Sequence, residues 1–144
     1  MSRPSTTPEL GDELGPQQRL APAADEIRRY GEAGGGREKI FSDEGHVHRL
    51  GLRGLVVPGP LLASYVEQFL YRQLPGWAVE QLSTTFRLPT AAGDLLTLRG
   101  AVTEDHHLAD GARIVCDVVV EHPNGDRAVT ASARLRKIDP AAGI

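Results

Sequence analysis

The sequence predicts an α+β domain in which an antiparallel sheet packs around one long helix. Only residues 59–74 have the apolar spacing of a long buried helix, and the apolar segments that follow alternate with a period of two residues. The chain has 144 residues, 40% of them hydrophobic, which is the size and apolar content of a domain with one core. We expect this domain to occupy residues 23–138.

A flexible arm is expected before this domain, over residues 1–22, and a short tail after it, over residues 139–144. The first 22 residues contain four prolines among small and polar side chains, a composition that buries little apolar surface. A short helix is expected next, over residues 23–33, because Ile27 and Tyr30 share one face and acidic residues precede basic ones. The glycines at 34–36 end that helix.

The central helix follows a segment of mixed pattern. Within residues 37–57 we expect a helical turn that begins with Ser42 or Asp43 as its N-cap. The helix over 59–74 then has Pro60 in its first turn and ends at Pro75. Its apolar stripe, which predicts a buried helix, consists of Leu61, Leu62, Tyr65, Val66, Phe69, Leu70 and Leu74.

The rest of the chain, after Trp77, has the pattern of β-strands. Apolar and polar residues alternate over 82–88, 96–102, 114–120 and 129–136. Asp110-Gly111 and Asn124-Gly125 are turn signals between these segments. We expect an antiparallel meander of four strands that covers the central helix.

Composition excludes several classes of function. A net charge of -3 and a pI of about 5.9 argue against nucleic-acid binding. No segment approaches the roughly 20 apolar residues of a membrane helix, and residues 1–22 lack the apolar core of a secretory signal. We therefore expect a cytoplasmic protein with no membrane partner. No cofactor or metal is expected, because His46 and His48 are two residues apart and point to different sides of a helix.

Three strings of sequence carry a resemblance to a known family. They are IRRYGEAGGG from Ile27, GLRGLVVPGPLLASYVEQFL from Gly51 and FRLPTAAGDLLTLRGAV from Phe86. With these strings, residues 27–138 resemble the MaoC-like branch of the hot-dog fold, the (R)-specific enoyl-thioester hydratases and 3-hydroxyacyl-thioester dehydratases. The resemblance implies a sheet curled around the helix at 59–74, pairing of two such units, and an acyl tunnel near the subunit boundary. It also implies a ligand that is an acyl thioester of coenzyme A or of an acyl carrier protein.

The family's catalytic dyad is missing from the matching positions. The family motif places an Asp and a His five residues apart, and an alignment without gaps puts Gly36 and Phe41 at these positions. Neither residue can transfer a proton, and loss of a positioned acid or base lowers the rate roughly 10²- to 10⁴-fold for each group. The resemblance also implies that the backbone N–H of Gly59 binds the developing oxyanion. The side chains that we expect to line the tunnel are Phe41, Tyr65, Trp77 and Phe86.

Other side chains near these positions are candidates for replacement acids or bases. They are Asp43, His46, His48, Tyr65 and Glu67. Each also has an alternative, purely structural role. Asp43, His46 and His48 would form a capped, solvated helical turn. Tyr65 would pack in the core with its hydroxyl hydrogen-bonded locally. The Glu67 carboxylate lies beside an apolar face, where it would either reach a partner subunit or have its pKa raised by burial, and both alternatives stay open.

Two hypotheses of function follow, and the sequence leaves open whether the protein is an enzyme. In the first, it binds an acyl or polyketide thioester as a non-catalytic partner, in a homodimer or in a heterodimer with a hot-dog subunit that has the dyad. In the second, it is an active dehydratase, isomerase or cyclase of a specialised intermediate, and its acid and base are among the replacement candidates.

Overall fold

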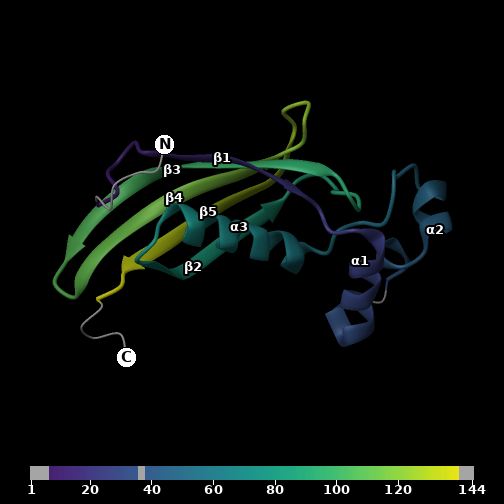
Figure 1. Ribbon diagram of the computed structural model, residues 1–144, viewed down its shortest axis with the longest axis horizontal. Coiled ribbons are helices and arrows are strands. Elements are labelled where there is room, and N and C mark those ends of the chain that lie inside the picture. The colour runs from purple at the N-terminus through teal and green to yellow at the C-terminus, as the bar shows by residue number, and fades with distance from the viewer. Residues whose placement is uncertain (1–6, 36–37, 140–144) are drawn as a thin grey trace.

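A computed structural model describes residues 7–35 and 38–139 (Figure 1). Five antiparallel strands form one sheet, and the helix α3 lies along one face of it, while α1 and α2 lie beyond the N-terminal end of α3. In chain order the elements are β1 (Glu13–Leu20), α1 (Ala24–Tyr30), the π-helical turn η1 (Gly31–Gly35), the 3₁₀ turn η2 (Lys39–Phe41), α2 (Glu44–Arg49), α3 (Gly59–Gln73), β2 (Trp77–Phe86), β3 (Leu95–Leu108), β4 (Gly111–Glu121) and β5 (Arg127–Lys137).

The helix α3 forms where its apolar spacing predicted it. Pro58 is its N-cap residue, and Pro60 lies in the first turn, where a missing N–H costs no helical hydrogen bond. The core lies between this helix and the sheet. From α3 the core contains Leu62, Tyr65, Val66, Phe69 and Leu70, and from the strands it contains Leu96, Leu98, Val102, Ile114, Cys116, Val118, Val120, Val129 and Leu135. The predicted α+β class, an antiparallel sheet around one long helix, is confirmed.

The order of the strands differs from the expected meander. The sheet has the order β1-β3-β4-β5-β2, so β2 pairs with β5 and not with β3. Tight connections join β3 to β4 and β4 to β5, and these three strands do form a meander. The connection over residues 87–94 is longer and carries the chain from one edge of the sheet toward the other. Alternation alone predicts strands and does not predict which strands pair.

The expectation of a flexible arm over residues 1–22 is wrong for the part that forms β1. This strand pairs antiparallel with β3, with Arg19 opposite Leu96, and Leu14 is buried in the core. A Cβ on Gly15 would lie 2.7 Å from the Leu98 carbonyl oxygen, so the two backbones approach closely there. Hydrogen-bonding groups at the edge of β3 order the segment, although its own composition contains few strand-forming residues. Residues 1–6 lie outside the described part of the chain.

The helical segments before α3 follow the sequence expectation closely. The helix predicted over residues 23–33 is observed as α1 followed by η1. Of the two N-cap candidates for α2, the cap is Asp43, whose carboxylate accepts a hydrogen bond from the His46 N–H. Within residues 7–35 and 38–139, no helix is long and apolar enough to span a membrane. Of the expected tail, residues 140–144 lie outside the described residues.

Candidate functional site

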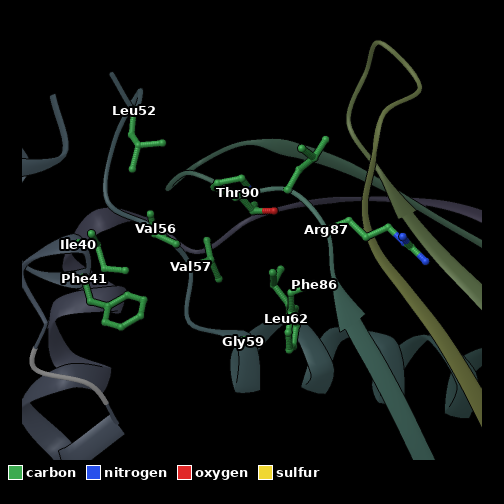
Figure 2. A pocket seen from close by; sticks show the side chains of 12 residues that line it. Ile40, Phe41, Leu52, Val56, Val57, Gly59, Leu62, Phe86, Arg87 and Thr90 are labelled. Carbon is green, nitrogen blue, oxygen red and sulfur yellow. The ribbon is translucent and has the colours of Figure 1, made fainter. Parts of the chain in front are cut away.

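A cavity of about 440 Å³ opens at the N-terminal end of α3 (Figure 2). Its walls come from η2, from the segment that precedes α3, from the first turns of α3, and from the end of β2 with the connection that follows. The lining residues are Ile40, Phe41, Leu52, Val56, Val57, Gly59, Leu62, Phe86, Arg87, Leu88, Pro89 and Thr90. Most of these side chains are apolar, and the volume suits a small organic ligand or part of a larger one.

Backbone hydrogen bonds hold the walls of this cavity in place. The segment before α3 lies beside the β2–β3 connection: the Val57 N–H donates to the Thr90 carbonyl at 2.8 Å, and the Ala92 N–H donates to the Leu55 carbonyl at 2.9 Å. On its other side, the Val56 N–H donates to the Ile40 carbonyl at 2.8 Å. Three segments that are distant in sequence therefore meet at the start of α3, and sequence periodicity could not predict this meeting.

Gly59 places a backbone donor at the cavity wall. It is the first residue of α3, and no described residue accepts a hydrogen bond from its N–H, whereas Leu61 and Leu62 donate to the Pro58 carbonyl. The positive end of the helix dipole lies at the same point, so a ligand carbonyl or oxyanion is favoured there. A Cβ at Gly59 would lie 2.9 Å from the ring of Phe86, which limits this position to glycine unless the ring moves.

Of the two positions at which the family resemblance implies the dyad, the structure describes one. Phe41 ends η2, is half-buried and lines the cavity, while Gly36 lies outside the described residues. The position at which the family resemblance implies an imidazole therefore presents a phenyl ring to the ligand space (Figure 2). A phenyl ring adds apolar surface and offers no proton.

Of the described residues that line the cavity, Arg87 is the one with an ionisable side chain. Its Nε donates to the Thr130 hydroxyl at 3.1 Å. In Figure 2 the guanidinium group extends away from Phe41 and Val57, toward the neighbouring strand. Among the described residues, the cavity lining includes no carboxylate and no imidazole, so these side chains can contact an apolar chain but supply no acid or base near pH 7.

Asp43, His46 and His48 lie away from this cavity, at and within α2. The Asp43 and His48 side chains are exposed, His46 is half-buried, and none of the three lines the cavity. The pKa of Asp43 lies below its ordinary value of 3.8, because its carboxylate accepts the His46 N–H and lies near the positive charge of Arg49. These features match a helix N-cap, the structural interpretation of this segment.

Tyr65, Glu67 and Trp77 are also absent from the lining of this cavity. The Tyr65 ring is buried in the core and lies under the guanidinium of Arg19, 3.4 Å from ring centroid to Cζ. Glu67 is exposed on α3, and Trp77 is buried in the core at the start of β2. Of the four residues expected to line a tunnel, the structure brings together Phe41 and Phe86, and it places Tyr65 and Trp77 elsewhere.

Sequence reasoning missed Thr90. Its side chain is fully buried at the cavity wall, and its hydroxyl has no hydrogen-bond partner among the described residues. The only signal in the sequence was a single hydroxyl between Pro89 and Ala91, in a connection where threonine is common on the surface. Pairing of this connection with the segment before α3 is what buries it.

No protein-family model and no curated protein matches the sequence. Solved structures do resemble it. An (R)-hydratase from A. caviae involved in PHA biosynthesis matches with a TM-score of 0.75 at 24% identity, over 91% of this chain and 97% of that one. A MaoC-like dehydratase from Rhodospirillum rubrum matches with a TM-score of 0.75 at 19% identity, over 92% of this chain and 94% of that one. This chain has the hot-dog fold.

A third similar structure is the ChsH1–ChsH2 complex from Mycobacterium tuberculosis. It matches with a TM-score of 0.73 at 20% identity, over 90% of this chain and 98% of that one. At 19 to 24% identity, these likenesses establish the fold, and the chemistry has to be argued from the cavity itself.

Proposed function

We propose that this hot-dog protein binds an acyl thioester in the cavity at the start of α3 and acts as a non-catalytic partner of a dehydratase or hydratase subunit. The carrier of the acyl group is coenzyme A or an acyl carrier protein. The observation that carries the proposal is the composition of the cavity wall. In the described part of the chain, it combines an apolar lining with a backbone donor at Gly59 that has no acceptor, and it includes no carboxylate or imidazole.

The two parts of an acyl thioester match the two parts of this wall. The alkyl chain is stabilised by transfer from water to the surface of Phe41, Leu52 and Leu62, at about 25 cal/mol for each Å² buried. The thioester carbonyl oxygen accepts a hydrogen bond and suits the Gly59 N–H at the positive end of the helix dipole. This pairing orients the thioester with its carbonyl at α3 and its chain among the apolar side chains.

A partner role fits the absence of acid and base groups better than a catalytic role does. Hydration of an enoyl thioester needs one group to activate water and another to move the proton at the carbon next to the carbonyl. The replacement candidates Asp43, His46, His48, Tyr65 and Glu67 do not line the cavity. Among the similar structures, ChsH1–ChsH2 is a complex of two differently named chains, which supports assembly of this chain with a second hot-dog subunit.

Restoring the dyad tests this proposal. The variant carries Gly36→Asp and Phe41→His, which puts an imidazole at the cavity wall. We expect no hydration of crotonyl-CoA by the natural protein and measurable hydration by the variant, detected as the loss of enoyl absorbance. Phe86→His with Gly36→Asp is the matched control, because it puts an imidazole on a different part of the same wall.

Two results would contradict the proposal. Hydration by the natural protein would show that it has its own acid and base, and alanine variants of His46 and His48 would then locate them. An inactive double variant that keeps its fold and still binds the thioester would show that Gly36 and Phe41 are not the dyad positions.

A further inference from the structure

Asp94 joins several segments of the chain at the end of the sheet where the cavity lies. Its carboxylate accepts hydrogen bonds from the Arg53 guanidinium at 2.6 Å and from the Ala91 N–H at 2.9 Å. Its main-chain carbonyl accepts the Ala21 N–H at 2.7 Å. In the turn between β4 and β5, the Nδ1 atom of His122 lies 3.8 Å from Asp94 Oδ2, the same oxygen that bonds Arg53. Segments from four parts of the chain therefore meet at one residue.

Of the two basic groups beside Asp94, Arg53 is the one that can leave. The side chains of Asp94 and His122 are 12% and 11% exposed, whereas that of Arg53 is 69% exposed. The Ala91 N–H holds the carboxylate in place, and the His122 N–H donates to the Asp126 carbonyl at 2.9 Å. Because most of the Arg53 side chain is in solvent, its guanidinium can become hydrated without a backbone movement.

The charged groups around His122 come from three segments. Asp94 faces it from the β2–β3 connection, and Arg53 lies on the other side of that carboxylate, in the segment before α3. In the turn of His122 itself, the Asp126 carboxylate accepts a hydrogen bond from the Asn124 amide at 3.0 Å. In the described part of the chain, no other ion pair includes His122, Asp94 or Arg53. A proton on His122 therefore places two cations beside one largely buried carboxylate.

Protonation of His122 and the Arg53–Asp94 ion pair oppose each other. Histidine is the side chain that ordinarily gains a proton between pH 8 and pH 5. An imidazolium 3.8 Å from the carboxylate is attracted to it and repels a guanidinium that bonds the same oxygen. Since the imidazole is buried and the guanidinium is exposed, this repulsion is relieved when Arg53 moves into solvent.

Release of Arg53 frees a turn that forms part of the cavity wall. The preceding residue, Leu52, lines the cavity (Figure 2). In the described chain no backbone hydrogen bond includes residue 53 or 54, so the ion pair is the tether of this part of the turn. Gly51 has a φ of +81°, and a Cβ there would meet nothing within 4 Å, so the turn has room to move.

We propose that His122 is a pH sensor for the cavity wall: its protonation displaces Arg53 from Asp94 and loosens the turn that carries Leu52. At neutral pH the turn is tethered and the wall is complete. At acidic pH the wall is loose, and an apolar ligand is bound less tightly. The switch belongs to the wall itself and operates with or without a ligand.

Hydrogen exchange of the full chain without ligand tests the switch. The readout is the protection factor of the Leu52 amide, which donates to the Val47 carbonyl, relative to amides in the β4–β5 pairing. Between pH 7.5 and pH 5.5 we expect this protection to fall about fivefold, the effect of losing one ion pair. His122→Gln should show no fall, because glutamine is polar and does not titrate.

Three further variants locate the effect. His46→Gln and His48→Gln should keep the fivefold fall, because both histidines lie on α2 and neither pairs with Asp94. Arg53→Gln changes an exposed side chain, and its protection should be low at both pH values because the tether is already absent. A fall that persists in His122→Gln, or full protection of Arg53→Gln at pH 7.5, overturns the proposal.

Ligand binding separates this inference from the proposed function. Octanoyl-CoA is titrated calorimetrically at both pH values into the natural protein and His122→Gln, which experience the same effect of pH on the ligand. On going to pH 5.5, the natural protein should lose about threefold more affinity than His122→Gln. Equal losses overturn the link between the turn and the cavity. If octanoyl-CoA binds neither protein, the proposed function fails, and the hydrogen-exchange result still decides the switch.

Discussion

Single residues decide what the cavity can do chemically. Phe41 contributes apolar surface to the cavity at the position where the family resemblance implies an imidazole, and the Arg87 guanidinium donates to the Thr130 hydroxyl. Gly59 supplies a backbone donor that needs no particular side chain. Under the proposed function, these residues bind and orient the thioester, and a second subunit supplies the acid and base.

Asp43, a candidate acid or base in the sequence, is the N-cap of α2 in the structure. Its pKa is lowered chiefly because the His46 N–H donates to its carboxylate, so ionised Asp43 stabilises the folded state. This contribution is complete above its ordinary pKa of 3.8 and is lost as the pH falls through the lower pKa of the folded protein. We therefore expect Asp43→Ala to lower Tm at pH 7, and the difference from the natural protein to shrink at pH 3.

Thermal unfolding followed by circular dichroism at the two pH values measures this effect. Asp43→Asn is the control, because asparagine also caps helices but does not titrate. A difference in Tm between the natural protein and Asp43→Ala that is the same at pH 7 and pH 3 would contradict the cap. Because Asp43 does not line the cavity, octanoyl-CoA should bind Asp43→Ala as tightly as it binds the natural protein.

At the scale of elements, α3 and β1 differ in how far sequence predicts them. The α3 helix has its own apolar stripe and a proline in its first turn, so local signals suffice. The β1 strand forms because β3 offers an edge and because α3 contacts its side chains. The Arg19 guanidinium lies over the Tyr65 ring and donates to the Gln68 side chain at 2.8 Å. Those contacts depend on the tertiary fold, which is why composition predicted an arm.

Removal of the Arg19 side chain should loosen β1 specifically. We expect Arg19→Ala to lower the free energy of unfolding by roughly 1 kcal/mol, because one cation–π contact and one hydrogen bond are lost at a half-buried site. Amide hydrogens in the β1–β3 pairing should exchange faster, while those in the β4–β5 pairing remain protected.

Tyr65→Phe is the control for this contact, because it keeps the ring under Arg19 and removes only the hydroxyl. It should leave exchange in β1 close to that of the natural protein. If Arg19→Ala left β1 as protected as before, the strand would depend on backbone pairing with β3 alone.

At the scale of the whole molecule, the fold was predictable and most of the site was not. The helix over 59–74 and the alternation after Trp77 specify a sheet packed on one helix, and Phe41, Gly59 and Phe86 were already candidate residues. Thr90 was missed, because burial of a threonine depends on pairing between segments about 35 residues apart. The pairing of β2 with β5 was missed because it also joins segments that are distant in sequence.

The measurement that tests the central claim most directly is calorimetric titration of octanoyl-CoA into the natural protein, Leu52→Trp and Leu50→Trp. Leu52 lines the cavity, whereas Leu50, two residues earlier, is 57% exposed and does not. If the cavity at the start of α3 holds the acyl chain, the natural protein and Leu50→Trp bind with similar affinity, and Leu52→Trp binds at least tenfold more weakly. Equal affinities for all three proteins, or no binding to the natural protein, would contradict the account.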